Sequence, residues 1–268
     1  MTSRIPNIFN KNKSKNKKTF ISYLVCGDPS KDITLSAMHT MSKSGVDIIE
    51  LGIPFTDPIA DGPTIQKSID RSLKNNTSLR DVISVVKEFR KDNNDTAVVL
   101  MGYMNPVHKM GIDKFAKQIN DTGVDGVLIV DSPPEESVML NKYLTKYKKS
   151  HIYLASPTTT DQRMKNISKM SSGYVYYVTI KGITGSQLSN VSSIRKNVNK
   201  IKKYSNNNLP VAVGFGIKDS SSAQKMAAFS DGIIIGSSIV ELIHKYSNNE
   251  KKMNSKLSTY ISSISNVI

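Results

Sequence analysis

The sequence predicts an α/β fold, a (β/α)8 TIM barrel of eight parallel strands that are each followed by helical structure. Short, nearly continuous apolar runs recur eight times, and segments with helical spacing of apolar residues lie between them. Buried parallel strands have this character, whereas half-exposed antiparallel strands alternate. Barrels of about 250 residues fold as one unit. Because the chain has 268 residues, we expect a single domain over residues 1–268.

The expected strands share an apolar run that ends in a polar or glycine-rich turn. In chain order they are residues 20–25, 47–51, 97–101, 126–130, 151–155, 174–178, 209–213 and 232–235. An open doubly wound sheet is the alternative, and it would require a dinucleotide-binding glycine pattern after the first strand. Gly27-Asp28-Pro29 does not fit that pattern, so the barrel is favoured.

The expected helices repeat apolar residues every three or four positions. They are residues 32–44, 78–91, 111–122, 161–171, 191–204 and 220–229, with two closing helical segments at 239–245 and 249–264. Ser78 is a plausible N-cap. Pro133 and Pro134 can begin a further helix after the fourth strand. The closing segments form extra C-terminal helical structure.

The charge is strongly positive, with 37 Lys and Arg against 22 Asp and Glu and a formal net charge of +15. Such an excess can indicate nucleic-acid or membrane binding. The lysines instead gather where helix surfaces or ends are expected, at residues 11–18, 142–149, 196–203 and 245–256, and no nucleic-acid motif accompanies them. No run approaches the roughly 18 apolar residues of a membrane span. We therefore expect neither partner.

The cysteine and histidine content favours a reducing compartment and no metal. Cys26 is the only cysteine, and at the end of a strand it is expected to be a small buried hydrophobe. His108 and His151 lack metal-ligand spacing. The basic N-terminal residues precede no apolar signal-peptide core. A cytoplasmic location is expected, or the plastid stroma if the AT-rich style of composition reflects plastid encoding.

The residues after the second strand carry the strongest functional signal. Glu50 ends an apolar run, where an unpaired carboxylate is costly to bury. Asp61 follows on a loop rich in proline and glycine. Two carboxylates in one cleft can divide acid and base roles when their surroundings separate their pKa values. We expect Glu50 to be the drier group and to carry protons, and Asp61 to stay ionised beside a proton-bearing nitrogen.

Two alternatives apply to these carboxylates. Glu50 could merely cap a neighbouring backbone segment at the strand end. Asp57 competes with Asp61 for the binding role, although it could instead hold the loop through an Asx-type bond.

Glycines follow the last three strands and predict a phosphate site. In barrels these loops often bind phosphate through backbone N–H groups and the N-terminus of a short helix. The residues concerned are Gly182, Gly185, Gly214, Gly216, Gly236, Ser237 and Ser238. Three tyrosines at or beyond strand ends, Tyr23, Tyr103 and Tyr176, could build an aromatic pocket. The alternatives are plain tight turns for the glycines and core packing for the tyrosines.

The stretch 50–66 resembles the signature of the tryptophan synthase alpha chain family almost residue for residue. The resemblance continues in order through residues 27–29, 101–106, 131–136, 182–185, 214–217 and 236–240, and Arg4, Ile5 and Phe9 resemble the family's N-terminal helix. It implies a carbon–carbon lyase of L-tryptophan biosynthesis. This enzyme cleaves indole-3-glycerol phosphate to indole and D-glyceraldehyde 3-phosphate and passes the indole to a beta chain.

The resemblance also assigns roles to residues. Glu50 and Asp61 are the catalytic pair, and Tyr176 lies beside Glu50, with Tyr103 as a further substrate-binding residue. Thr184 reaches Asp61 when the loop after the sixth strand closes. The phosphate rests on Gly185, Gly216, Gly236 and Ser237. No cofactor is implied in this chain, and the expected partner is the beta chain, which holds pyridoxal phosphate in an alpha2beta2 tetramer.

The chain departs from the family pattern at three places. Thr179-Ile180-Lys181 replaces a frequent Ser-Arg, Val25 replaces a common threonine, and Tyr23 stands where a phenylalanine often lines the indole pocket. Apolar residues after the second and third strands could dock the beta chain or line the pocket (Ile53, Pro54, Phe55, Met104 and Pro106). Two other functions stay open: another phosphosugar barrel such as an isomerase, and a basic scaffold or nucleic-acid-binding module.

Overall fold

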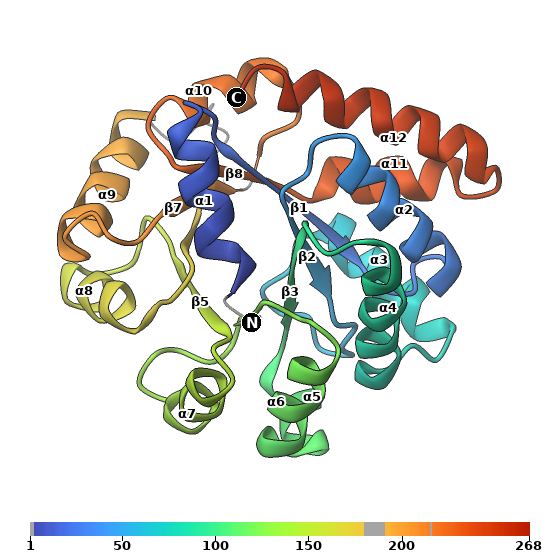
Figure 1. Cartoon of the computed structure of the whole chain (residues 1–268), viewed down its shortest axis with the longest axis horizontal. Helices are drawn as coiled ribbons and strands as arrows, with labels where there is room; N and C mark the ends of the chain where they lie inside the picture. Colours follow the sequence, from blue (N-terminus) through green and yellow to red (C-terminus); the bar gives the residue numbers. More distant parts are fainter. Residues whose placement is uncertain (1–2, 180–190, 215) are drawn as a thin grey trace.

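The computed structural model describes residues 3–179, 191–214 and 216–268 and contains a closed barrel of eight parallel strands (Figure 1). Each strand pairs with the next along the chain, and β1 also pairs with β8. The strands are β1 (Thr19–Val25), β2 (Ile48–Gly52), β3 (Ala97–Gly102), β4 (Gly126–Ile129), β5 (Ser150–Ala155), β6 (Val175–Val178), β7 (Val211–Gly214) and β8 (Gly232–Ile235). The predicted barrel is confirmed.

Helices surround this barrel and connect its strands (Figure 1). They are α1 (Arg4–Ser14), α2 (Lys31–Lys43), α3 (Pro63–Lys74), α4 (Leu79–Asp92), α5 (Met104–Met110), α6 (Ile112–Asp121), α7 (Val138–Lys146), α8 (Asp161–Met170), α9 (Val191–Tyr204), α10 (Ser220–Ala227), α11 (Ser237–Tyr246) and α12 (Glu250–Ser265). The expected N-terminal and C-terminal helices are present. Ser78 caps α4 through a capping box with Asp81.

Three local expectations were wrong or incomplete. Helices α3 and α5, which follow β2 and β3, were not predicted. Pro133 and Pro134 do not begin a helix, because the next helix starts at Val138. The hydroxyl of Ser137 donates to the Pro133 carbonyl at 2.8 Å, so this segment forms a turn before the helix begins.

The barrel interior is filled by side chains from alternate strand positions. Ile21, Ile48, Val99, Leu128 and Ile152 pack together inside it, whereas the intervening residues pack against the helices. This alternation follows from the two-residue period of a strand.

Helix α1 covers the N-terminal end of the barrel interior. Ile5 and Phe9 are buried with the interior side chains, and the Phe9 ring lies 5.7 Å from the Tyr174 ring. Arg4 and Arg90 both pair with the buried Asp125, at 2.9 and 2.8 Å. A buried carboxylate needs such partners, so this network fixes α1 on the barrel.

Helix α3 is anchored to the loop after β1. Arg71 donates twice to Asp28, at 2.7 and 2.6 Å, and Ser68 donates to the same carboxylate. The two hydrogen bonds from Arg71 form a geometrically specific pair. Because α3 begins just after Asp61, this anchor positions the loop that carries Asp61.

Two further observations concern Cys26 and the apolar length of the helices. Cys26 is fully buried, and burial raises the pKa of its thiol to about 12, as expected for a packed hydrophobe. Within residues 3–179, 191–214 and 216–268, no helix is long and apolar enough to cross a membrane.

Candidate active site

Glu50 lies in the middle of β2 and points into the barrel. It shares the inward face with Ile48, and in the strand register it stands opposite Tyr23 of β1 and Val99 of β3. The side chain is 0% exposed to solvent but lines the cavity described below. A carboxyl group in this position is surrounded by apolar strands and opens only toward that cavity.

The hydrogen bonding of Glu50 is incomplete. The hydroxyl of Tyr174, the residue before β6, donates to Oε1 at 2.5 Å. Oε2 has no hydrogen-bond partner among the residues that the structure describes. Burial raises the pKa of Glu50 to about 8, and the hydrogen bond from Tyr174 opposes that rise. Burial disfavours the charged form of a carboxyl group, so Glu50 holds its proton near neutral pH and can exchange it there.

Asp61 lies on the loop after β2 and is held by Tyr103. The Tyr103 hydroxyl donates to Asp61 Oδ2 at 2.7 Å and accepts from the Ala60 N–H at 3.1 Å. Burial raises the pKa of Asp61, and the hydrogen bond from Tyr103 lowers it. The second oxygen of Asp61 has no hydrogen bond to the residues that the structure describes, so it can accept from a ligand in the cavity.

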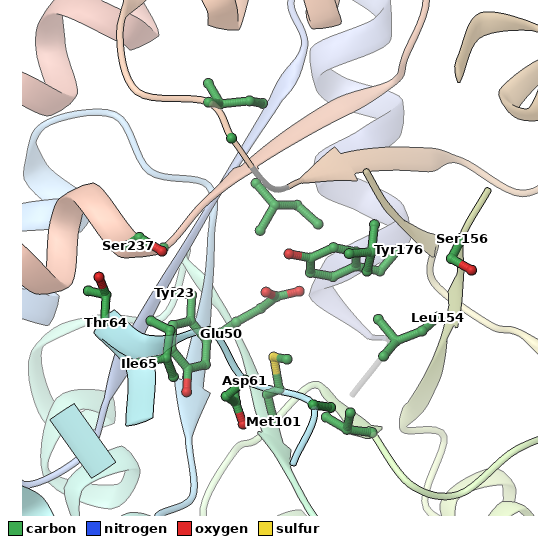
Figure 2. Close-up of a pocket in the computed structure, with 18 of the residues that line it drawn as sticks. Tyr23, Glu50, Asp61, Thr64, Ile65, Met101, Leu154, Ser156, Tyr176 and Ser237 are labelled. Carbon is green, nitrogen blue, oxygen red and sulfur yellow. The ribbon is translucent and has the colours of Figure 1, made fainter. Parts of the chain in front are cut away.

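Glu50 and Asp61 line one cavity of about 610 Å³ at the carboxyl ends of the strands. Figure 2 shows Glu50 extending toward Tyr176, with Tyr23, Ile65 and Asp61 on the opposite side. The apolar part of the wall comes from several strands and includes Ile65, Met101, Val130, Leu154 and Ile234. A mostly apolar cavity with a few converging polar groups is typical of a small-molecule site.

The cavity wall also includes residues predicted to bind phosphate. Gly216, Gly236 and Ser237 line it, and α11 begins at Ser237 with Gly236 as its N-cap residue. The first N–H groups of a helix lack partners within the helix and favour an anion. Lys218, which the sequence analysis missed, lines the same region and adds a positive charge.

The other predicted residues are Thr184, Gly185, Asp57 and Tyr103, and Tyr103 holds Asp61 without itself lining the cavity. Thr184 and Gly185 lie outside the described residues. Asp57 is exposed and is absent from the cavity wall; its carboxylate accepts from the Thr56 hydroxyl at 2.6 Å. The competing role of Asp57 in the site is thus not supported by its position.

No metal site is evident in the described part of the chain, where no three His, Cys, Asp or Glu side chains gather. His151 is buried against Tyr153, whose hydroxyl lies 2.9 Å from Nδ1. Burial lowers the pKa of His151 to about 4. The neutral ring is therefore a packed core group, remote from the cavity wall.

The residues around this cavity match a known family. A family model described as "Tryptophan synthase alpha chain" matches residues 9–268. The chain belongs to the tryptophan synthase alpha chain family. The resemblance noted on the signature at 50–66 is thereby confirmed over nearly the whole chain.

Individual tryptophan synthase alpha chains are similar in sequence and structure. The protein of Marinobacter nauticus is 48% identical over 244 residues, which cover 91% of this chain and 90% of that protein. The protein of Vesicomyosocius okutanii is 42% identical over 254 residues, 95% of each chain. The crystal structure of tryptophan synthase subunit alpha from Legionella pneumophila superposes with a TM-score of 0.92 at 37% identity, covering 100% of this chain and 99% of that one.

The three departures from the tryptophan synthase alpha pattern have different surroundings. Tyr23 lines the cavity, whereas Val25 is buried beside Ile65 and Ile69 and does not. Thr179 donates to the Gly214 carbonyl at 3.1 Å, and residues 180–181 lie outside the described part. Among the departures at described residues, Tyr23 is the one that lies in the cavity wall, where it adds a hydroxyl.

Proposed function

We propose that this cavity cleaves indole-3-glycerol phosphate to indole and D-glyceraldehyde 3-phosphate, with Glu50 and Asp61 dividing the proton work. As a tryptophan synthase alpha chain, the protein is a carbon–carbon lyase of tryptophan biosynthesis. The observation that supports the residue roles is the pairing of two carboxyl groups with different surroundings in one cavity: Glu50 is fully buried, and Asp61 is half-buried at the loop.

The first step requires a proton at carbon C3 of the indole ring, because indole leaves poorly as a carbanion. Glu50, with a pKa of about 8, is protonated at neutral pH and can donate from the cavity-facing side. The positive charge then develops at the ring nitrogen. Asp61 accepts the nitrogen's N–H through the oxygen that Tyr103 leaves free, and this stabilises the charge.

The second step breaks the bond between C3 and the side chain. The hydroxyl on the adjacent carbon loses its proton and becomes the aldehyde, and the bonding electrons return to the ring. Glu50, ionised by the first step, takes up that proton. Apolar walls hold the ring, while Gly216, Gly236 and Ser237 bind the phosphate together with Gly185. Thr184 would complete the site at Asp61 when the loop after β6 closes.

A beta chain is the proposed partner, in an alpha2beta2 tetramer that receives the indole. By family resemblance pyridoxal phosphate belongs to that beta chain and this chain uses no cofactor. Docking or pocket lining was left open for Ile53 and Pro54; both residues are buried and neither lines the cavity, so their positions support neither role. Ile59, Val138 and Met139 are instead 85%, 63% and 52% exposed on the loop after β2 and the start of α7, at the carboxyl end of the barrel, where a partner would cover them.

We also infer that residues 1–268 act as one domain, because α1 and α12 both pack on the barrel. The bacterial relatives support a cytoplasmic location, with the plastid stroma as the alternative for a plastid-encoded chain.

The function is tested by supplying indole-3-glycerol phosphate to the purified protein, with and without a beta chain, and measuring indole. We expect indole in both cases and more in the presence of the beta chain. An isomerase would convert the compound without releasing indole, and that result would overturn the proposal. Salt-sensitive binding to random DNA, unaffected by Glu50→Gln, would favour the scaffold alternative.

A further inference from the structure

Two tyrosines line the cavity, and two others contact its carboxylates; the two groups differ in the hydrogen bonding of their hydroxyls. Tyr103 donates to Asp61, and Tyr174 donates to Glu50. Tyr23 and Tyr176 line the cavity, and neither hydroxyl is hydrogen-bonded to any residue within 3–179, 191–214 or 216–268. A tyrosine hydroxyl that a bound ligand covers needs a hydrogen-bond partner. The hydroxyls of Tyr23 and Tyr176 can therefore each form a hydrogen bond with a ligand in the cavity.

The position of the Tyr23 hydroxyl is fixed by the backbone. Its ring packs with Val25, Ile65 and Val240, and the residue is 8% exposed. The hydroxyl lies over Gly52, where an added Cβ would be 2.4 Å from the Tyr23 oxygen. A side chain at position 52 would displace the hydroxyl, so the glycine makes room for it.

The Tyr23 hydroxyl lies on the Asp61 side of the cavity. Tyr23 stands opposite Glu50 in the strand register, and its hydroxyl extends past Glu50 toward the level of Gly52. Burial raises the pKa of the Tyr23 hydroxyl, and the carboxylates of Asp61 and Glu50 raise it further. Figure 2 shows Tyr23 and Asp61 together, across from Tyr176 and Leu154.

An unsubstituted indole ring offers this hydroxyl no acceptor. Its one polar group, the N–H, is a donor, and the proposed function assigns that group to Asp61. Covering a polar group without giving it a partner is unfavourable. A site with a hydrogen-bonding group in the wall therefore favours a ligand that carries a matching polar atom.

We propose that Tyr23 gives this enzyme a further activity, the cleavage of indole-3-glycerol phosphates whose ring carries an oxygen substituent beside the ring nitrogen, at carbon 7. Carbon 7 is the benzo-ring carbon nearest the nitrogen, whereas carbon 4 lies on the C3 side, near Glu50. The Tyr23 hydroxyl donates to the substituent oxygen while Asp61 accepts the N–H. The inference rests on the proposed function, because that function sets the orientation of the ring.

The reaction of the substituted compound balances as for the parent compound. The bond between C3 and the side chain breaks, C3 gains one proton, and the side-chain hydroxyl loses one to become the aldehyde. The ring oxygen is neither oxidised nor reduced, so no co-reactant is needed. The products are a 7-hydroxyindole and D-glyceraldehyde 3-phosphate.

The test uses the reverse condensation of D-glyceraldehyde 3-phosphate with substituted indoles. We would measure kcat/KM for 7-hydroxyindole, 7-methylindole, 4-hydroxyindole and 4-methylindole, each relative to indole. The methyl compounds control for size. We expect the ratio of kcat/KM for the hydroxy compound to that for the methyl compound to be about tenfold larger at carbon 7 than at carbon 4. Tyr23→Phe should make the two ratios equal. Tyr147→Phe, at the end of α7, controls for tyrosine replacement elsewhere.

The outcomes separate the two proposals. If plain indole does not condense, the proposed function fails. If indole condenses and the ratio of kcat/KM for 7-hydroxyindole to that for 7-methylindole is the same in wild type and Tyr23→Phe, the inference is wrong. Water then satisfies the Tyr23 hydroxyl. Calorimetry provides a second test that needs no variant. It compares the affinities of the wild-type protein for 7-hydroxyindole and 7-methylindole with glycerol 3-phosphate present. Equal affinities there would also overturn the inference.

Discussion

Replacing Glu50 with glutamine is expected to lower kcat by about 10³-fold or more while leaving the binding of glycerol 3-phosphate nearly unchanged. Glutamine keeps the shape of the side chain and can still accept from Tyr174, but it cannot donate and recover a proton. A positioned acid–base group contributes about 10²- to 10⁴-fold, and Glu50 acts in both steps. Glu50 is not one of the residues proposed to bind the phosphate, so its replacement should lower kcat without lowering phosphate affinity.

The measurement is single-turnover indole release together with calorimetric binding of glycerol 3-phosphate. Glu88→Gln is the matched control, because Glu88 is an exposed residue that pairs with Lys91 on the surface. It should keep wild-type activity. Retention of more than about a tenth of the activity by Glu50→Gln would refute the proton-carrying role.

The second large effect concerns stability, which Glu50→Gln should increase at alkaline pH. In the folded protein Glu50 holds its proton up to a pKa of about 8, compared with an ordinary value of 4.5. Between these values the folded state binds more protons than the unfolded state, so the free energy of unfolding falls as pH rises. Glutamine does not titrate. The stability difference in favour of the variant should therefore grow by roughly 3 kcal/mol between about pH 5.5 and about pH 8.5.

Urea unfolding of both proteins at the two pH values measures this difference, and all other titrating groups cancel in the comparison. A difference that stays constant with pH would mean that Glu50 ionises normally in the folded protein. A larger stability of the variant combined with lost turnover would show that the site is maintained at the expense of stability.

The barrel and the two carboxylates were predictable from sequence for the same physical reason. Parallel strands buried on both faces produce continuous apolar runs, and Glu50 interrupts such a run with a charge that is costly to bury. The loop after β2 was harder to interpret. Ile53 turns inward, with its N–H donating to the Met101 carbonyl at 2.7 Å, so its apolar side chain does not reach the docking surface. The sequence gives no local signal for that turn.

Tyr174 and α3 show what pattern reasoning misses. Tyr174 lies on the same face as Tyr176, two positions on, but an inward tyrosine at the start of a strand has the same pattern whether it packs in the core or binds a carboxylate. Helix α3 buries Ser68 and Ser72 as well as Ile65 and Ile69. The two serines interrupt the helical repeat of apolar residues in α3. They are buried because they hydrogen-bond to Asp28 and to the Cys26 carbonyl, which are distant in sequence.

The central claim, that Glu50 carries the proton to and from carbon C3 while Asp61 binds the ring nitrogen, is tested most directly by hydrogen exchange at C3. Indole would be incubated in D₂O with the protein and glycerol 3-phosphate, and loss of the C3–H signal would be followed by NMR. We expect rapid exchange with the wild type, exchange about 10²-fold slower with Asp61→Asn, and only the uncatalysed background with Glu50→Gln. Exchange at the wild-type rate in Glu50→Gln would contradict the claim.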